Sequence, residues 1–385
     1  WSSDVCSSDL PCKTVLYQID IFNRILMKFS TSKTELQQAL QKLSKATPTR
    51  STLPILGCVL IESTEEKTTL RATDLEITIQ AEIPVSLEQA GATALPLKTL
   101  LDITNELPET RITLTVDDKD RAAIITDAGE YDLMAKPADE FPAVPDTSGS
   151  QKVDVPGDML KNIIGATSFA VSRDELKPAL TGVLFRISSA GITAVSTDGH
   201  RLVKYTRKDF NANGFTGDMI VPRKFLAFML TQSITGDVSL LIGENHLTAK
   251  IGNDMVLTRI IDERFPDYES VIPKENDKTL KADKNALLGA IRRVSIFSNK
   301  STKQIALSLD INKITITTED PENITTGKES IDCLYSGEPM TIGYNSQYLG
   351  DVLKNQKTEE IKILFKSSLL GILYLPVYFF ILTSA

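Results

Sequence analysis

A module that occurs three times along this 385-residue chain constrains its fold more than any other feature. Each copy begins with a stretch whose apolar residues recur with the helical period. A strand pair ending in an Asp-containing turn follows, and then a second helical stretch led by Pro or Gly. The first helical stretches are 35–47, 158–170 and 285–297, the turns 71–76, 195–200 and 316–322, and the second helical stretches 95–107, 221–233 and 342–353. Because these landmarks keep one order at near-constant spacing, we predict three equivalent domains in a quasi-symmetric object.

Within the first copy, the sequence alternates between helical and strand periods. The first helical stretch carries Leu36, Leu40 and Leu43 on one stripe, and Pro96 stands in the first turn of the second, where its missing N–H costs nothing. Alternating segments around these helices predict strands, including a three-strand meander after the second helix. The predicted fold class is α+β, with three repeated domains that each pack two helices on antiparallel sheets. Linker-like segments at 142–150 and 273–281 place these domains at 27–148, 149–276 and 277–385.

The two ends of the chain differ in character from the rest. Residues 1–26 lack the basic region, apolar core and cleavage site of a secretory signal, and a clean strand starts at Met27. We therefore interpret 1–26 as a foreign or non-native leader. Residues 369–382 are almost wholly apolar, but they number 14 and include Pro376, whereas a spanning helix needs about 20 residues. We interpret 366–385 as an anomalous tail from an altered reading frame, with a membrane anchor or a buried core strand as alternatives.

Composition and charge narrow the class of protein. Hydrophobic residues make up 42% and charged residues 24% of the chain, as in a soluble globular protein. A formal charge of −8 excludes a generally basic coat for nucleic acid but not a local basic patch. The cysteines form no C-x-x-C pair, which favours a reducing, cytoplasmic location over a disulfide framework or a zinc site. They are Cys6, Cys12, Cys58 and Cys333.

Charge is split between the two kinds of element. Acidic residues concentrate in strands and turns, whereas Lys and Arg concentrate in the helical stretches and their entrances. If all helices faced one way, this acidic chain would present one basic surface suited to a phosphate backbone. Ordinary solvated helix faces would give the same pattern, so charge alone leaves both interpretations open. The basic set is Lys33, Lys42, Lys45, Arg50, Lys98, Lys161, Arg173, Lys177, Arg223, Lys224, Lys284, Arg292, Arg293, Lys300 and Lys303.

Several short motifs together carry a resemblance to a known family. They are TLPIL (52–56), ATDLE (72–76), STDGHRL (196–202), VPRK (221–224), RFPDY (264–268) and GYNSQYLGDVL (343–353). In this order they resemble the bacterial DNA polymerase III β subunit family, the replicative sliding clamps, from Met27 to about Phe365. The central motifs are specific in combination, although any one of them alone would be weak.

The resemblance implies an assembly and a set of partners. Two chains would join head to tail into a homodimeric ring of six domains, with helices around the hole and sheets outside. Such a ring holds duplex DNA by enclosure, so weak and mobile phosphate contacts suffice and the acidic net charge is no obstacle. The implied partners are double-stranded DNA, the DNA polymerase III catalytic subunit, a clamp loader and other proteins with clamp-binding motifs, with no membrane. The implied protein is a non-catalytic processivity factor without a cofactor or a metal.

The family also places a peptide-binding pocket between the second and third domains. The matching positions in this chain are Leu180, Thr197, Gly199, His200, Arg201, Leu202, Pro266, Val271, Asn345 and Tyr348. Apolar walls of this kind receive a Leu or Phe side chain, while a few polar groups fix the peptide backbone. Ser270 stands where the family often has Arg, and the segment 366–385 replaces the tail that completes the family's pocket.

A second set of residues matches the family's DNA contacts. Arg50 precedes TLPIL, Arg173 and Lys177 lie in the corresponding loop of the second domain, and Arg223 and Lys224 open a helix. The amides at a helix N-terminus would add to phosphate attraction there.

Two other functions compete with the clamp. One is a hydrolase that uses Asp198 and His200, but no recognisable nucleophile, metal-binding pattern or Walker glycine loop accompanies them. Asp198 has sequence counterparts at Asp74 and Asp320, which instead predicts a turn residue that binds its own backbone. The other is a monomeric repeat adaptor that binds peptides without enclosing DNA. Phe265 and Tyr268 are interpreted as packing residues at the pocket edge rather than as base-stacking residues.

Overall fold

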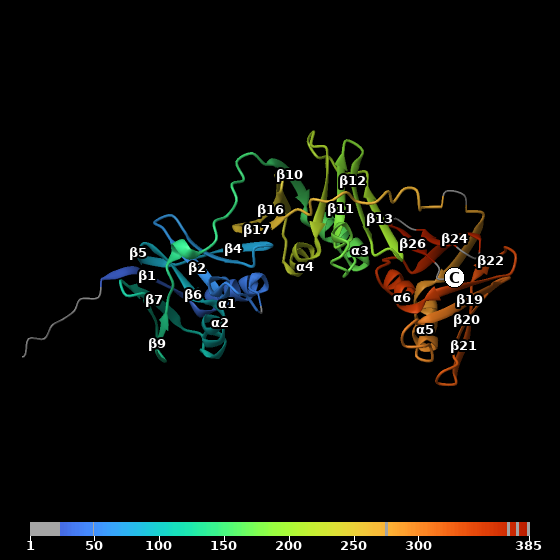
Figure 1. Ribbon diagram of the computed structural model, residues 1–385, viewed down its shortest axis with the longest axis horizontal. Coiled ribbons are helices and arrows are strands. Elements are labelled where there is room, and N and C mark those ends of the chain that lie inside the picture. Colours follow the sequence, from blue (N-terminus) through green and yellow to red (C-terminus); the bar gives the residue numbers. More distant parts are fainter. Residues whose placement is uncertain (1–23, 49, 274–275, 368–369, 375–376, 383–385) are drawn as a thin grey trace, which may run out of the picture.

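The domains of the protein lie in an arc, with the helices on its concave side (Figure 1). The computed structural model describes residues 24–385 apart from 49, 274–275, 368–369, 375–376 and 383–385. Each domain contributes two helices and their surrounding strands, which confirms the predicted fold class. The helices are α1 (Lys33–Leu43), α2 (Leu97–Glu106), α3 (Gly157–Thr167), α4 (Arg223–Thr231), α5 (Lys284–Ser295) and α6 (Ser346–Lys354).

The described strands form antiparallel sheets in which each strand is hydrogen-bonded to the next one named. The first sheet is β5 (Ser86–Gln89), β1 (Ile25–Ser32), β7 (Arg111–Asp117), β8 (Arg121–Thr126) and β9 (Gly129–Met134). The second is β10 (Gln151–Pro156), β15 (Asp237–Ile242), β16 (His246–Ile251), β17 (Asp254–Arg259), β4 (Ile77–Ile83), β3 (Thr68–Thr73), β2 (Cys58–Ser63) and β6 (Gly91–Pro96). The third is β14 (Gly217–Pro222), β11 (Gly182–Ser188), β12 (Gly191–Thr197), β13 (Arg201–Arg207), β26 (Val377–Leu382), β25 (Leu370–Tyr374), β24 (Glu360–Ser367), β18 (Lys278–Asp283) and β22 (Leu334–Tyr335). The fourth is β21 (Thr325–Asp332), β20 (Lys313–Asp320), β19 (Gln304–Asp310) and β23 (Met340–Asn345).

Two of these sheets run across domain boundaries. Strand β4 of the first domain pairs with β17 of the second, with Ile77 opposite Thr258. Strand β13 of the second domain pairs with β26 of the third, with Leu202 opposite Phe380. The main-chain hydrogen bonds of each boundary therefore continue those of the sheets, and the same kind of edge pairing joins successive domains. Strands β9 and β21 end their respective sheets.

Helix starts explain where the sequence prediction was accurate and where it was not. In α1, Ser32 accepts a hydrogen bond from the Glu35 amide, and the predicted stripe of Leu36, Leu40 and Leu43 is fully buried. Pro96 precedes α2 as its N-cap and ends strand β6, so its predicted place within the first turn was wrong by one position. The apolar residues before α4 and α6 likewise belong to strands β14 and β23, because a buried strand and a buried helix turn share one composition.

The two ends of the chain are described only in part. Residues 1–23 of the predicted leader lie outside the described residues, and strand β1 begins at Ile25. In the predicted anomalous tail, β25 pairs with β24 and β26 pairs with β13, so the described backbone there is extended. Within the described residues, no helix is long and apolar enough to cross a membrane.

Candidate functional site

A short turn with a Thr and an Asp recurs at the domain boundaries. Asp198 accepts hydrogen bonds from the amides of His200 and Arg201, both at 3.0 Å, and Asp74 accepts from Glu76 and Ile77 at 3.1 and 2.9 Å. These bonds confirm the predicted role of Asp198 as a turn residue that binds its own backbone.

In the third domain, the Asp of the turn stands one position earlier in its hairpin than Asp198 does in the second domain. Its hairpin pairs Asp320 with Thr325, as the second domain pairs Thr197 with Leu202. Asp320 accepts from the Glu322 amide at 3.2 Å, the same spacing at which Thr197 accepts from Gly199. The predicted equivalence of Asp320 with Asp198 was therefore wrong. Asp320 occupies the Thr position, since a carboxylate can replace a hydroxyl as the acceptor.

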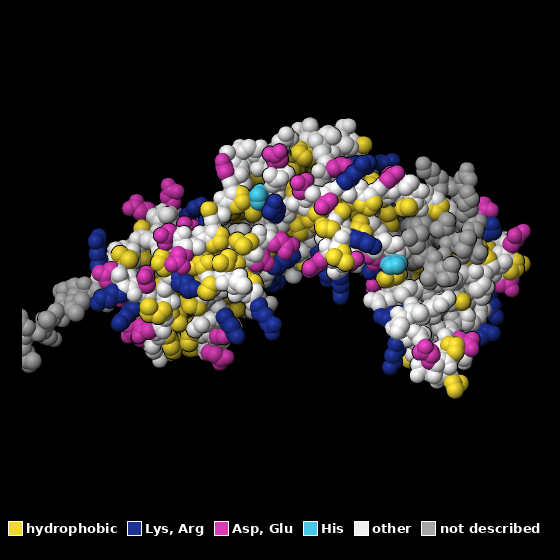
Figure 2. Space-filling model, viewed as in Figure 1, with side chains coloured by type: hydrophobic (Ala, Val, Ile, Leu, Met, Phe, Trp, Pro, Cys, Tyr) yellow, Lys and Arg dark blue, Asp and Glu magenta, His cyan; other side chains and the backbone are white. Residues whose placement is uncertain are grey.

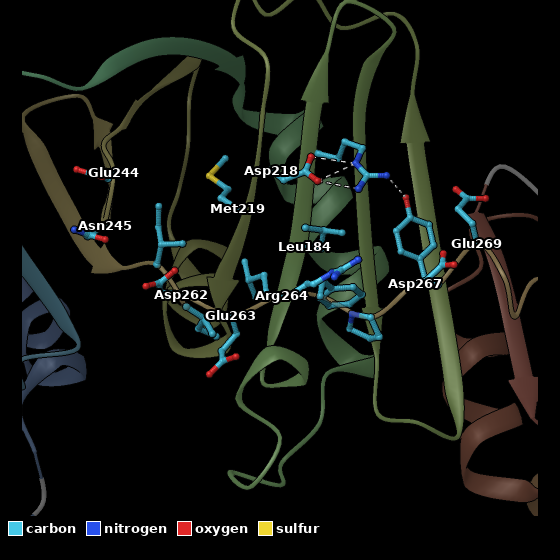
Figure 3. Close-up of a pocket in the computed structure, with 17 residues that line it drawn as sticks. Leu184, Asp218, Met219, Glu244, Asn245, Asp262, Glu263, Arg264, Asp267 and Glu269 are labelled. Carbon is cyan, nitrogen blue, oxygen red and sulfur yellow. Dashed lines mark hydrogen bonds and ion pairs between the residues drawn. The ribbon is translucent and has the colours of Figure 1, made fainter.

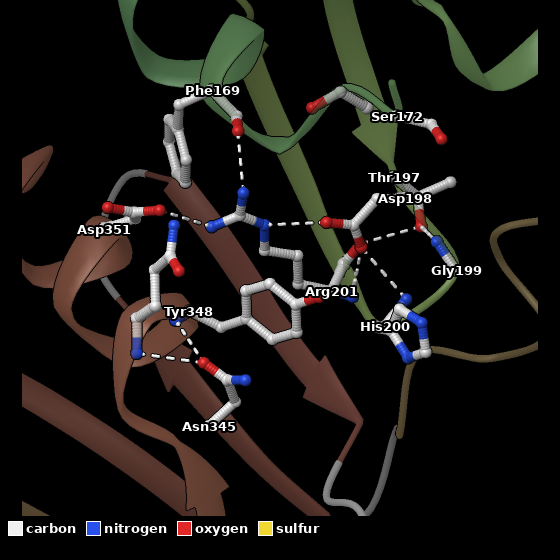
Figure 4. A network of polar contacts seen from close by, with 12 residues as sticks. Phe169, Ser172, Thr197, Asp198, Gly199, His200, Arg201, Asn345, Tyr348 and Asp351 are labelled. Carbon is white, nitrogen blue, oxygen red and sulfur yellow. Dashed lines mark hydrogen bonds and ion pairs between the residues drawn. The ribbon is translucent and has the colours of Figure 1, made fainter. Parts of the chain in front are cut away.

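Arg201 connects the second domain to the third through a buried network (Figure 4). The residue is 8% exposed, and its guanidinium donates to Asp198 at 3.0 Å, to Asp351 at 2.9 Å and to the carbonyl of Phe169 at 2.9 Å. Asp351 lies on α6 of the third domain, whereas the other partners belong to the second. A planar cation with this many bonds fixes the relative position of its partners.

Aromatic rings enclose the same guanidinium. The Arg201 guanidinium carbon lies 4.7 Å from the ring centre of Tyr348 and 5.4 Å from that of Phe169. The His200 ring stacks on Tyr348, with the two ring centres 6.0 Å apart. Asn345 begins α6 by accepting from the amides of Gln347 and Tyr348 at 2.9 and 3.2 Å. The turn of the second domain and the start of α6 therefore meet face to face.

The remaining residues predicted for the peptide pocket lie in several elements of the second domain and its linker. Thr197 is buried and donates to the carbonyl of Arg201, while Gly199 is exposed at a φ of 90°. Leu202 packs in an apolar cluster with Leu184 and Tyr268, and Leu180 ends the short helix Pro178–Leu180. Val271 follows the linker 260–269 and is 47% exposed, so its side chain is open to solvent.

Pro266 lines a groove under the linker 260–269 (Figure 3), and this groove adjoins the cluster of Leu202 through Leu184 and Tyr268. This groove has a volume of about 510 Å³ and lies against β11 and β14 of the second domain. Within it, Arg186 donates from Nε to Oδ1 and from Nη2 to Oδ2 of Asp218, a bidentate pair, and also donates to the Tyr268 hydroxyl at 3.1 Å. Burial raises the pKa of Tyr268. Tyr268 and Phe265 pack edge to face, as the packing interpretation predicts, whereas no sequence motif pointed to Arg186 and Asp218.

A cavity of about 750 Å³ lies at the boundary of the first and second domains; we call it the basic cavity because its Arg and Lys side chains outnumber its acidic residues, Glu76 and Glu175. Arg173 and Arg223 line it, and so does Arg259, which the sequence prediction missed. Lys224 lines it too, but this lysine forms an ion pair with Asp74 of the first domain. Burial lowers the pKa of Lys224.

The other predicted DNA contacts are exposed. Lys177 belongs to the same loop as Arg173, and both side chains face solvent. Arg50 is exposed before the short helix Pro54–Gly57, away from the basic cavity. In Figure 2, Lys and Arg side chains project from the concave side of the arc, below the helices of successive domains. The concave side is therefore lined with dispersed cations rather than with one tight basic pocket.

The site offers no catalytic arrangement in the described part of the chain. Both carboxylate oxygens of Asp198 are engaged, by the turn amides and by the Arg201 guanidinium, so the carboxylate does not pair with the His200 ring. No group of three or more His, Cys, Asp or Glu within the described residues could hold a metal ion.

Comparison with known proteins gives the class of this chain. Models of the N-terminal, central and C-terminal domains of the DNA polymerase III beta subunit match residues 27–145, 154–267 and 269–375. The chain belongs to this family. It is a DNA sliding clamp, the non-catalytic processivity subunit of a polymerase holoenzyme.

Individual relatives agree along most of the chain. The beta sliding clamp of Proteus mirabilis is 34% identical over 342 residues, covering 88% of this chain and 93% of the relative. That of Escherichia coli is 31% identical over 345 residues, covering 89% and 94%. The crystal structure of the Bacillus subtilis polymerase sliding clamp superposes with a TM-score of 0.89 at 27% identity, covering 93% of this chain and 99% of the other.

Proposed function

We propose that this clamp works as a head-to-tail homodimer that encircles duplex DNA in the cytoplasm and tethers the DNA polymerase III catalytic subunit to it. The observation that carries the proposal is the arc itself, in which helices α1–α6 share the concave side and present Lys and Arg there. We also place the domain limits at 27–148, 149–276 and 277–385. A clamp loader would open the ring, since no nucleotide-binding loop is present in the sequence.

The sheet edges support closure of the ring by a second copy. Strand β9 has the place in its hairpin that β17 has in the second domain, since Thr126 pairs with Gly129 as Ile251 pairs with Asp254. Strand β21 corresponds in the same way to β4. Because β4 pairs with β17 inside the chain, β21 of one subunit should pair with β9 of its partner.

The internal register then predicts the register between subunits. Val256 lies opposite Ile79 at the internal boundary, which places Tyr131 opposite Thr326 of the other copy. Apolar side chains exposed near these edges would be buried by the contact, among them Met134 at 65% and Ile324 at 91% exposure. Closing the ring would therefore add apolar burial to the main-chain pairing.

The register has a direct test by disulfide trapping. The double variant Tyr131→Cys/Thr326→Cys should form an intersubunit disulfide under mild oxidation, because directly opposed strand residues bring their Cβ atoms within reach of one. The pair Tyr131→Cys/Glu329→Cys, three residues out of register, is the matched control. Equal trapping of both pairs, or of neither, would refute the register.

The peptide pocket is proposed to be the tether. Its residues are Leu180, Thr197, Gly199, His200, Arg201, Leu202, Pro266, Val271, Asn345 and Tyr348. An extended peptide would place an apolar side chain against Leu202 and Val271, while exposed His200 and Gly199 remain open to its backbone. A polymerase bound at this pocket stays near its primer end after each release, because tethering raises its effective concentration.

DNA contact is proposed through Arg50, Arg173, Lys177, Arg223 and Lys224. Arg173 and Arg223 make no ion pair within the described chain and remain available to phosphates. Lys224 is engaged by Asp74, so we expect it to contribute least of the set. With few and weak contacts, retention on DNA depends on ring closure rather than on affinity.

Topology separates this proposal from a monomeric peptide adaptor. The clamp, assembled on nicked circular duplex by a bacterial clamp loader, should stay bound through gel filtration and leave when a restriction enzyme linearises the circle. The adaptor hypothesis predicts that the protein is retained equally on circular and on linear DNA. Elution as a monomer, together with equal retention on circular and linear DNA, would refute the ring.

A further inference from the structure

A small cavity lies where the second domain meets the third, between α3 and the turn that follows α6. Its volume is about 290 Å³, which is ample room for a small ion together with ordered water. Helix α3 contributes Lys161, Asn162 and Gly165, and the segment 354–358 contributes the facing wall. The amino group of Lys357 donates to Asn162 at 2.5 Å, so the two walls are in contact at the rim. The cavity shares no lining residue with the peptide pocket or with the proposed DNA contacts.

The lining of this cavity is positive. Lys161, Lys354 and Lys357 line it, and no Asp or Glu is among the lining residues. Lys161 makes no ion pair within the described part of the chain, and Lys354 approaches Asp351 only at 3.6 Å. A further cation, Lys284, donates to the Gln356 carbonyl at 3.1 Å from behind the wall. The local potential therefore favours an anion.

The wall also holds buried polar groups without partners. Gln356 is 4% exposed and lines the cavity, yet its side-chain Nε2 has no hydrogen-bond partner among the described residues. The hydroxyl of Thr358, in the same wall, is buried and equally without a partner. Buried donors are normally satisfied, so each exception needs an explanation, and a bound ion is one that fits the positive lining of this cavity. An amide donor, a hydroxyl and several ammonium groups around one small space form a binding set for an oxyanion.

We propose that this cavity binds a phosphate group. Gln356 Nε2 and Thr358 Oγ1 would donate to its oxygens, while Lys161 and Lys357 would balance its charge from opposite walls. The ligand would thereby join α3 of the second domain to the turn after α6 of the third. Both helices lie on the concave side, so the phosphate could come from the DNA backbone or from free phosphate in solution (Figure 1).

Calorimetric titration of inorganic phosphate into the full-length protein tests the site. We expect saturable binding at constant ionic strength, with chloride as the reference anion that shows none. Gln356→Leu keeps the side-chain size but removes the donor, and it should weaken binding about tenfold. The double variant Lys161→Met/Lys357→Met should abolish binding. Lys250→Met, an exposed lysine on β16 without an ion pair in the described chain, is the matched control and should bind like wild type.

A second arm separates the two sources of phosphate. Wild type and Gln356→Leu are compared for their dissociation from nicked circular DNA after loading. If free phosphate fails to bind but Gln356→Leu leaves DNA faster than Lys250→Met does, the backbone is the source. If Gln356→Leu matches wild type in both arms while thermal melting shows that it is folded, the cavity holds water only and the proposal is overturned. Neither result bears on ring closure, which the circular-to-linear comparison tests by itself.

Discussion

The same kind of turn stands at both domain boundaries within the chain, but it makes different contacts at each. At the first, Asp74 of the turn makes a single ion pair with Lys224 at the start of α4. At the second, the turn itself carries Arg201, which binds Asp198, Asp351 and the Phe169 carbonyl and lies against Tyr348. The first boundary leaves a basic cavity whose arginines make no ion pair in the described chain, and the second holds the residues that we propose bind a peptide. The same turn therefore makes different contacts at the two boundaries, and our proposal gives the two boundaries different functions.

Removing Arg201 should have the largest effect of any change at these boundaries. Arg201→Met leaves Asp198 and Asp351 facing each other without their shared cation, at a cost of about 3 kcal/mol in the free energy of unfolding. Urea denaturation measures this loss, and peptide binding should vanish with it. Arg207→Met, on the same strand but in an exposed pair with Asp209, is the control and should change stability by less than about 1 kcal/mol. Similar losses for the two variants would show that the buried Arg201 network contributes no more to the free energy of unfolding than an exposed ion pair does.

A milder change at the same boundary tests whether Arg201 positions the peptide-binding residues, apart from its effect on the stability of the fold. Asp351→Asn keeps the size of the side chain but removes the charge that holds one arm of Arg201. We expect about 1.5 kcal/mol weaker binding of a clamp-binding peptide, because the guanidinium and the Tyr348 ring above it lose their fixed position. Fluorescence anisotropy with a labelled peptide measures this. Lys354→Met, which removes the other neighbour of Asp351, should leave peptide affinity unchanged, and an equal loss there would contradict the positioning role.

The sequence predicted the architecture well because the repeat is encoded in local patterns. The stripe of Leu36, Leu40 and Leu43, the turn acceptors and the order of the landmarks are all read within short windows. The residues that contact these turns cannot be found within a short window, because Asp351 lies 150 residues from Arg201 and only the fold brings them together. For the same reason Arg259 escaped notice as a neighbour of Arg223. The shifted turn at Asp320 escaped because one-residue register changes leave the composition intact.

The first boundary should respond more weakly to the loss of its ion pair. Lys224→Met removes the partner of Asp74, but the lysine is 39% exposed on its side chain, so the expected loss of stability is about 1 kcal/mol. Dissociation from circular DNA should barely change, whereas Arg223→Met, beside it on α4 and without an ion pair in the described chain, should speed sliding and salt-induced release. Stopped-flow salt challenge of the loaded ring compares the two variants. A larger effect of Lys224 than of Arg223 on DNA release would reverse our assignment of structural and DNA-binding roles.

The smallest expected effect concerns pH at the first boundary. Burial, with the nearby Arg259 charge second, lowers the pKa of His246 below its usual 6.5. Between that lowered pKa and 6.5 the unfolded chain binds more protons than the folded one, so stability falls as the pH drops through this window. Solvent screens this partly exposed ring, which keeps the loss on the order of 0.3 kcal/mol. Urea midpoints at pH 7.5 and 5.5 should show a smaller difference in His246→Gln than in wild type. His200→Gln, which removes the only other histidine but leaves His246 in place, should keep the wild-type difference. If His246→Gln keeps the wild-type difference as well, the pH response originates in another titratable group. Protonation of His246 beside Arg259 would then not distinguish this boundary from the one built around Arg201.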